Sequence, residues 1–210
     1  KSEAITVNLT EGETTLTKTF QTEKRDFPIT QLILSETQKD QGETPESAVE
    51  NIIQNDGTLI YEVLGAPHKK IHIQGPFIFP LNGKPLNVGG FGNIRKSGET
   101  EIRHLGVDLD GKRGDPVFST HAGEVRMAQN LSNFGNTIII DHGASIFSLY
   151  LHLNEMFVNT GDTVVQEKKI GTIGNTGAYS LAPHLHFSTK IGTASVDPLL
   201  FLEISKKLAK

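Results

Sequence analysis

Cysteine and tryptophan are absent from this sequence of 210 residues. Without cysteine the protein can form no disulfide, no thiolate metal site and no cysteine nucleophile. Any zinc ion that it binds must therefore be held by histidine and carboxylate side chains. Those side chains are the ligand set of hydrolytic sites rather than of purely structural ones.

The charge balance excludes two further classes of partner. Lysine and arginine total 20 and aspartate and glutamate total 24, so the formal net charge is −4. No global basic field therefore attracts nucleic acid or an anionic membrane surface. No apolar run approaches the ~20 residues that a membrane-spanning helix needs. Because the chain opens at Lys1, without methionine or a signal peptide, we expect a mature or trimmed form.

The sequence contains short runs of strand-forming residues and no long apolar runs. Valine, isoleucine, threonine and phenylalanine recur between 21 glycines and 9 prolines. This composition indicates a strand-rich fold with frequent turns. The length allows one or two domains, enough to bury a sizeable core.

The first third of the chain divides into two parts. Residues 1–34 alternate apolar and polar side chains, which predicts a small β-rich domain or segment. Residues 35–74 are predicted to be a short helical linker. Within it Pro45 suits a first helical position, Glu46 favours the positive end of the helix, and Gly57 can stop the helix.

Residues 75–210 form the second predicted domain, where glycine and strand formers are dense. Near its end, Asp197 can cap a terminal helix at 199–208, with Pro198 in the first turn.

Five metal-ligand or acid–base side chains occur at short spacings in this second domain: His104, Asp108, His152, His184 and His186. Successive side chains of a strand point to opposite faces, so three expected strands each carry imidazole or carboxylate on a single face. The apolar neighbours expected on the other face are Leu105, Val107, Leu109, Leu149, Leu151, Leu153, Leu185 and Phe187. This pattern predicts a metalloenzyme site built on a sheet.

Ordered motifs surround these residues. The chain reads Phe-Gly-Asn-Ile-Arg at 91–95, His-Leu-Gly-Val-Asp at 104–108, Leu-Tyr-Leu-His-Leu at 149–153 and Pro-His-Leu-His-Phe at 183–187, with glycine-rich turns between them. Together they closely resemble the lysostaphin-like (LytM, M23) zinc peptidases, which cut peptide cross-links in bacterial peptidoglycan. The resemblance covers roughly residues 76–202. It implies a largely antiparallel all-β peptidase domain.

The resemblance also implies roles for the five residues. His104, Asp108 and His186 would be the ligands of one zinc ion per chain, and His152 and His184 would be the catalytic pair outside the ligand set. Zinc can lower the pKa of a bound water to ~7 and polarise an amide carbonyl. The two histidines can then move protons, although the base and the acid are not assigned between them.

Partners and location follow from the same resemblance. We expect peptidoglycan stem peptides or cross-bridges as substrate, a monomer, and a place in the periplasm or at the cell surface of a bacterium. The segments 96–103, read as a polar loop, and 178–183 are expected to set which cross-link fits. Tyr150 is expected on the same face as His152. The other histidines, His68, His72, His121 and His142, are expected to be packing or surface residues.

Three alternatives remain open. A catalytically silent relative could bind the cell wall or activate partner amidases, and would lack some of the ligands. A biotinyl or lipoyl carrier would present a lysine in a tight hairpin, where this chain has Asn175. Finally, the N-terminal region could hold the enzyme latent, with a linker carboxylate reaching the zinc. The linker carboxylates are Glu36, Asp40, Glu43, Glu46 and Glu50.

Overall fold

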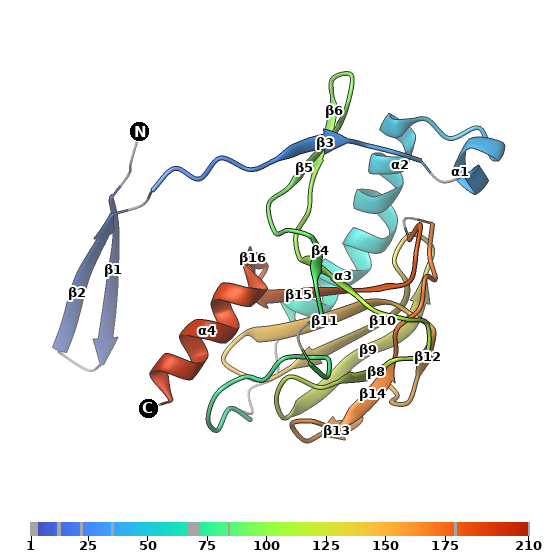
Figure 1. Cartoon of the computed structure of the whole chain (residues 1–210). Helices are drawn as coiled ribbons and strands as arrows, with labels where there is room; N and C mark the ends of the chain where they lie inside the picture. The colour runs from blue at the N-terminus through green and yellow to red at the C-terminus, as the bar shows by residue number, and fades with distance from the viewer. Residues whose placement is uncertain are drawn as a thin grey trace.

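An eight-stranded antiparallel sheet dominates the computed structural model, which describes residues 4–11, 14–21, 23–34, 36–66, 72–83, 85–178 and 180–209 (Figure 1). The strand order is β13-β9-β10-β11-β15-β7-β4, and β16 pairs with β15. The strands are β4 (Asn87–Gly89), β7 (Val107–Asp110), β9 (Gly123–Leu131), β10 (Gly135–Asp141), β11 (Ile146–Leu153), β13 (Thr163–Val164), β15 (His184–Ile191) and β16 (Ala194–Val196). The prediction of a largely antiparallel all-β fold is confirmed.

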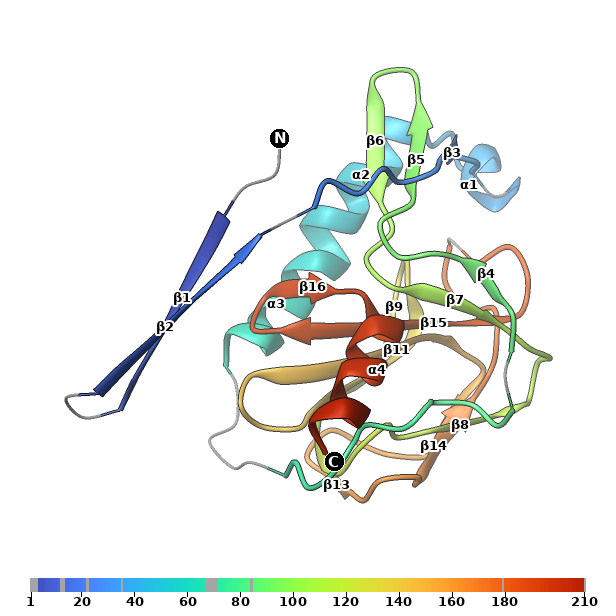
Figure 2. The same cartoon turned by 60° about the vertical axis from the view of Figure 1, so that its left-hand side comes forward.

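The central strands are buried on both faces of this sheet. Along β10, Ile138 and Ile140 belong to one hydrophobic core and Ile139 belongs to another, because successive side chains point to opposite faces. Helix α3 (Thr58–Gly65) contributes to the second core, and helix α4 (Pro198–Leu208) contributes to the first. The two helices therefore cover opposite faces of the sheet (Figure 2).

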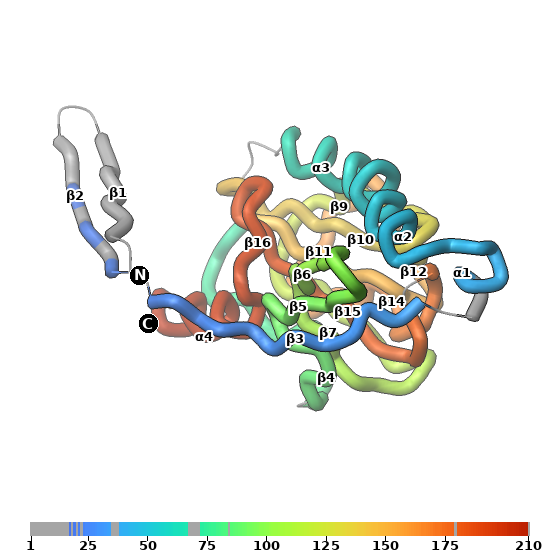
Figure 3. The backbone as a smooth tube through the Cα atoms, turned by 90° about the horizontal axis from the view of Figure 1, so that it is seen from above, coloured from blue at the N-terminus to red at the C-terminus, as the bar shows by residue number. Residues whose placement is uncertain are grey.

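Two smaller sheets flank the large one. Strands β12 (Glu155–Met156), β14 (Lys169–Thr172) and β8 (Pro116–Phe118) form one antiparallel sheet. The other contains β3 (Ile29–Gln31), β5 (Ile94–Ser97) and β6 (Thr100–Arg103), in which β3 runs parallel to β5 (Figure 3). A hairpin of β1 (Ala4–Glu11) and β2 (Thr14–Gln21) opens the chain.

Strands β5 and β6 correct one expectation. Residues 96–103 were expected to be a loop, but most of them form a hairpin in which Ser97 pairs with Thr100. Gly98 occupies the turn at a φ of 58°. A left-handed conformation is one that glycine adopts at little cost, so the hairpin closes tightly.

The linker at 35–74 contains more helix than expected. Helix α1 (Glu36–Asp40) precedes α2 (Pro45–Asn51), which begins at Pro45 behind a reciprocal capping box of Thr44 and Ser47. Gly57 does not stop the helix. A π-helical segment, η1 (Ile52–Gly57), leads directly into α3, so the continuous helix reaches Gly65.

Gly57 explains why the helix continues. Its φ and ψ of −60° and −45° are helical, and a Cβ there would lie 2.9 Å from the carbonyl oxygen of Ile52. Glycine therefore permits the wide turn instead of ending the helix. In the same turn Asp56 is buried, and its carboxylate accepts hydrogen bonds from the backbone N–H groups of Asn133 and Phe134 at 2.7 and 3.1 Å.

The terminal helix agrees with its prediction. Asp197 caps it by accepting from the N–H groups of Leu199 and Leu200, and Pro198 is the first helical residue. Within the described residues, no helix is long and apolar enough to span a bilayer.

Candidate metal centre

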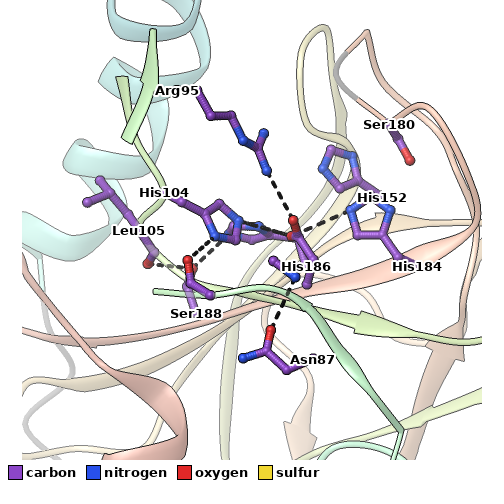
Figure 4. Close-up of polar contacts among 12 residues, drawn as sticks. Asn87, Arg95, His104, Leu105, His152, Ser180, His184, His186 and Ser188 are labelled. Atoms are coloured by element: carbon purple, nitrogen blue, oxygen red, sulfur yellow. Dashed lines mark hydrogen bonds and ion pairs between the residues drawn. The ribbon is translucent and has the colours of Figure 1, made fainter. Parts of the chain in front are cut away.

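Three neighbouring strands, β11, β15 and β7, bring four of the sequence-predicted side chains together (Figure 4). His186 of β15 lies directly opposite Asp108 of β7. His184 is two residues before His186 and therefore shares its face of the sheet. His152 lies at the end of β11, next to Leu151, which pairs with His186.

The polar atoms of His104, Asp108 and His186 converge on one point. His104 Nε2 lies 3.0 Å from Asp108 Oδ1 and 2.9 Å from His186 Nδ1, and His186 Nδ1 lies 2.9 Å from the same aspartate oxygen. All three ligand atoms lie within 4.8 Å of one another. The group is largely buried, with His104 7% and Asp108 8% exposed.

Hydrogen bonds at the far side of each ring set the tautomers. His104 Nδ1 lies 2.9 Å from the Gly90 carbonyl, which can only accept, so Nδ1 carries the proton. The Ser188 hydroxyl donates to the Leu105 carbonyl, so it accepts from His186 Nε2 at 3.0 Å. In the neutral rings, His104 Nε2 and His186 Nδ1 are then unprotonated. Two nitrogen lone pairs and a carboxylate oxygen face one another, which is favourable only around a cation.

His104 departs from the expected strand geometry. It lies between β6 and β7, before the strand begins, and Leu105 is 42% exposed instead of facing the core. The turn passes close to β15, because a Cβ on Gly106 would collide with the Ser188 hydroxyl and the His186 ring. Only glycine allows His104 to approach His186 in this way.

Arg95 joins the site from β5 and was missed in the sequence. Its guanidinium donates to Asp108 Oδ2 at 3.1 Å (Figure 4). Burial alone would raise the pKa of Asp108, but the adjacent rings of His104 and His186 outweigh burial and hold this pKa well below its usual range. The carboxylate is therefore an anion with one oxygen bound by arginine and the other facing the imidazoles.

His152 and His184 stand beside the cluster, with ring centroids 5.0 Å apart. His152 Nδ1 donates to the Thr176 carbonyl at 2.9 Å, and His184 Nδ1 donates to the Ala182 carbonyl at 2.8 Å. Each ring therefore has a bare Nε2, and that of His184 lies 3.6 Å from Asp108 Oδ1. Two proton acceptors thus lie next to the point where the three ligand atoms meet.

The backbone at His152 is left-handed, with a φ of 64°. The register with β10 shifts opposite it, between Asn136 and Ile138, which marks a β-bulge. The bulge breaks the alternation along β11, so Tyr150 is fully buried in the core instead of sharing a face with His152. A non-glycine residue in this conformation is uncommon and costly, and here it turns the imidazole toward the other histidines.

Burial keeps the imidazoles of His152 and His186 neutral. It lowers the pKa of His152 to about 3, with the charges of His184 and His186 acting in the same direction. Burial also lowers the pKa of His186 to about 4. Neutral rings are the form that binds metal ions and accepts protons.

The remaining histidines lie away from this site. His121 packs against Phe77 with ring centroids 4.7 Å apart, and buried His142 lies 2.8 Å from the hydroxyl of Ser148. His68 lies outside the described residues.

The linker carboxylates whose side chains the structure describes are not part of the cluster; they are Asp40, Glu43, Glu46 and Glu50. Within the described part of the chain, His104, Asp108 and His186 are the one group of histidine and acidic side chains close enough to hold a metal ion. Glu43 instead accepts from Gln38. The structure therefore does not support latency through any of these four carboxylates.

Comparison with protein families assigns a large part of the sequence. Residues 102–198 match the model described as Peptidase family M23. The chain is 41% identical over 96 residues to Lipoprotein NlpD of Yersinia enterocolitica, covering 45% of this chain and 97% of that protein. It is 37% identical over 130 residues to Uncharacterized lipoprotein YgeR of Escherichia coli, covering 60% of this chain and 47% of that protein.

A further relative carries a functional name. Over 110 residues the chain is 36% identical to Murein hydrolase activator NlpD of Escherichia coli, covering 52% of this chain and 28% of that protein. The chain thus spans less than half the length of YgeR and less than a third of this activator.

Solved structures extend the comparison to the whole fold. A candidate peptidase M23 from Pseudomonas aeruginosa superposes with a TM-score of 0.67 over 98% of this chain and 75% of that chain, at 19% identity. At that identity the likeness shows the fold alone. A zinc-containing peptidase from Vibrio cholerae superposes with a TM-score of 0.55 at 31% identity, covering 59% of this chain and 39% of that chain.

Proposed function

The chain belongs to peptidase family M23, and from this premise we propose that it is a zinc-dependent endopeptidase that hydrolyses peptide cross-links of bacterial peptidoglycan. One observation carries the proposal. The ligand atoms of His104, Asp108 and His186 converge with their lone pairs unprotonated, which is a donor set suited to a divalent cation. The Vibrio cholerae neighbour, which contains zinc, supports the choice of metal.

His104, Asp108 and His186 would hold one zinc ion per chain, through two imidazole nitrogens and a carboxylate oxygen. When bound, zinc would supply a Lewis acid for the substrate carbonyl and lower the pKa of a nearby water to ~7. Arg95 would keep Asp108 Oδ2 occupied, so that Oδ1 alone is presented to the ion. Ser188 would hold His186 in the tautomer that leaves Nδ1 free.

His152 and His184 would move the protons of the reaction. Amide hydrolysis adds water across the C–N bond, so one proton must leave the attacking water and another must reach the departing amine. The bare Nε2 of each ring can accept the first proton, and the resulting imidazolium can donate it to the amine nitrogen. The carbonyls of Thr176 and Ala182 keep both rings oriented through Nδ1.

The relatives also support a location. Two of them are named lipoproteins and another is named a murein hydrolase activator. We place this chain outside the cytoplasm, in the periplasm or at the cell surface, where peptidoglycan peptides are accessible. Its state as a monomer remains a prediction.

A second candidate function comes from the same relatives. The chain could activate a separate murein hydrolase, as the name of the 36% identical relatives implies for those proteins. Such a role would need no metal ligands, whereas here His104, Asp108 and His186 are all present and converge. We therefore rank the peptidase first.

The test is zinc content measured alongside digestion of purified peptidoglycan, with products identified by mass spectrometry. We expect one zinc ion per chain and peptide products that vanish in the His186→Ala variant. Zinc-independent release of products only after a partner amidase is added would favour the activator. Neither zinc nor products under any condition would reject both functions.

A further inference from the structure

A polar cleft of about 690 Å³ lies between the linker helices and two turns of the large sheet. One wall comes from the connection between α1 and α2, from α2 and from η1, and the other from the end of β9, the β9–β10 turn and the segment after β14. The lining residues with side-chain amides or hydroxyls are Gln41, Asn51, Asn55, Asn130, Ser132, Asn133, Asn175 and Ser180.

The lining suits a neutral ligand that offers many hydrogen-bonding groups. No lysine, arginine or histidine lines the cleft among the described residues, so an anion would find no counter-charge. The one carboxylate, Glu43, already accepts from the amides of Gln38 and Asn51. Carboxamides donate and accept in one plane, which matches hydroxyl and acetamido groups equally well.

Asn133 supplies an independent sign of a ligand. It lines the cleft and is only 5% exposed, yet its Nδ2 has no hydrogen-bond partner in the described structure. Its backbone N–H is bound to Asp56 at 2.7 Å, which holds the residue in place. A buried amide donor without a partner is costly, and at a residue that lines the cleft a small side-chain rotation toward a ligand acceptor would relieve that cost.

The cleft adjoins the metal centre through one segment. Asn175, Gly177 and Ser180 line the cleft, and the Thr176 carbonyl between them accepts from His152 Nδ1. A ligand in the cleft would therefore run next to a peptide positioned for cleavage.

We propose that this cleft binds the glycan strand of peptidoglycan through the hydroxyl and N-acetyl groups of its amino sugars. The inference rests on the proposed function, because it names a second part of the same substrate. Stem peptides carry free carboxylates, which this cation-free lining does not match. The glycan strand offers neutral hydroxyl and acetamido groups along its length, and it bears the peptides that would reach the metal centre.

The probe is chitotetraose, a chain of four N-acetylglucosamine units without any peptide. Binding to the full chain is followed by backbone and side-chain amide NMR shifts, in zinc-free buffer, so that cleavage plays no part. We expect the shifts to map to the cleft, at 51–55, 130–133 and 175–180. The variant Asn133→Asp keeps the shape but removes the donor, and should raise the Kd about tenfold, the loss expected for one hydrogen bond.

Asn159→Asp is the matched control, because Asn159 is exposed and does not line the cleft. Its Kd should equal that of the parent chain. If Asn133→Asp fails to fold, Asn55→Asp on the opposite wall replaces it, since Asn55 is exposed on η1 and also lines the cleft.

Several outcomes would overturn the inference. They are no binding of chitotetraose, shifts outside the cleft, equal weakening by Asn159→Asp, or cleft shifts produced by a stem tetrapeptide but not by the sugar. Digestion of peptidoglycan is measured separately. Digestion without sugar binding would leave the proposed peptidase standing and reject the glycan site. Sugar binding in the cleft without digestion would support the site and count against the peptidase.

Discussion

Arg95 donates a hydrogen bond to Oδ2 of Asp108 at 3.1 Å, while Oδ1 of the same carboxylate lies 3.0 Å from His104 Nε2. Arg95 stands in register with Thr30 in the parallel pair of β5 and β3. An N-terminal strand thus holds in place the strand that carries Arg95, and the arginine connects that strand to a proposed metal ligand.

Removing this guanidinium should weaken zinc binding. In Arg95→Leu, Asp108 loses the partner of its second oxygen, and we expect zinc affinity to fall about 10–100-fold, as for other groups that orient metal ligands. Competition with a chromogenic chelator measures the affinity. The control is Arg103→Leu, on the exposed part of β6. Equal affinities for both variants would show that Arg95 does not orient Asp108.

Loss of a proposed ligand should remove metal and activity together. His104→Ala deletes one of the converging nitrogens, so we expect the purified protein to contain little zinc and to release no peptides from peptidoglycan. Elemental analysis and product detection check the two effects. His184→Ala is the matched histidine variant, and it should keep its zinc.

His152→Ala should separate metal binding from turnover. The ring lies outside the converging set and is proposed only to move protons. We expect zinc content to be unchanged and turnover to fall about 10²–10⁴-fold. Release of the zinc by this substitution would mean that the division between ligand and catalyst is wrong.

Acid should destabilise the zinc-free protein. Burial lowers the pKa of His142 to about 3 from an ordinary 6.5, and the charges of His121 and His72 also lower it. The unfolded chain therefore binds more protons between these two values, so stability is complete above the unfolded pKa and falls as pH drops through the window. The lowered pKa of Asp108 acts in the same direction at more acid pH.

We expect a lower Tm at pH about 4.5 than at pH about 7.5, measured by calorimetry without zinc. His142→Gln removes the titrating group and should reduce that difference. An undiminished difference would show that other groups cause the acid sensitivity.

Asp56 should contribute to the free energy of unfolding through its two hydrogen bonds. Asp56→Ala leaves the N–H groups of Asn133 and Phe134 without their acceptor, and Asn133 is buried. We expect the free energy of unfolding to fall by about 1–3 kcal/mol, measured by urea denaturation. Asp40→Ala, at the exposed end of α1, should change it by less than about 0.5 kcal/mol. Similar losses in the two variants would contradict this role.

Much of the site could be predicted because it depends on local spacing. His184 and His186 are two residues apart on one strand, and alternation alone places them on one face. Asp108 follows the same rule on β7. The antiparallel all-β fold was predicted from the family resemblance, and the order of its motifs carried that prediction.

What could not be predicted depends on contacts between distant segments. Arg95 reaches Asp108 from a different sheet, and no spacing rule links the two. The sequence around His152 contains no glycine or proline that would indicate a β-bulge. The rule that side chains alternate along a strand therefore wrongly placed Tyr150 on the same face as His152. Glycine usually ends a helix, but at Gly57 the chain continues through the π-helical turn of η1. The hydrogen bonds that buried Asp56 makes in that turn stabilise it.

One residue, Phe134, joins the linker helix to His152 through its backbone. The N–H of Phe134 is held by Asp56, and the carbonyl of Phe134 accepts from the N–H of His152 at 3.0 Å. Any recombination that exchanged residues 35–74 for those of another protein would thus alter the anchor of a histidine more than 70 positions away. The same holds for a truncation beginning near Gly75. Residues 75–210 joined to another protein would need a different acceptor in place of Asp56 for the β-bulge at His152 to keep its shape.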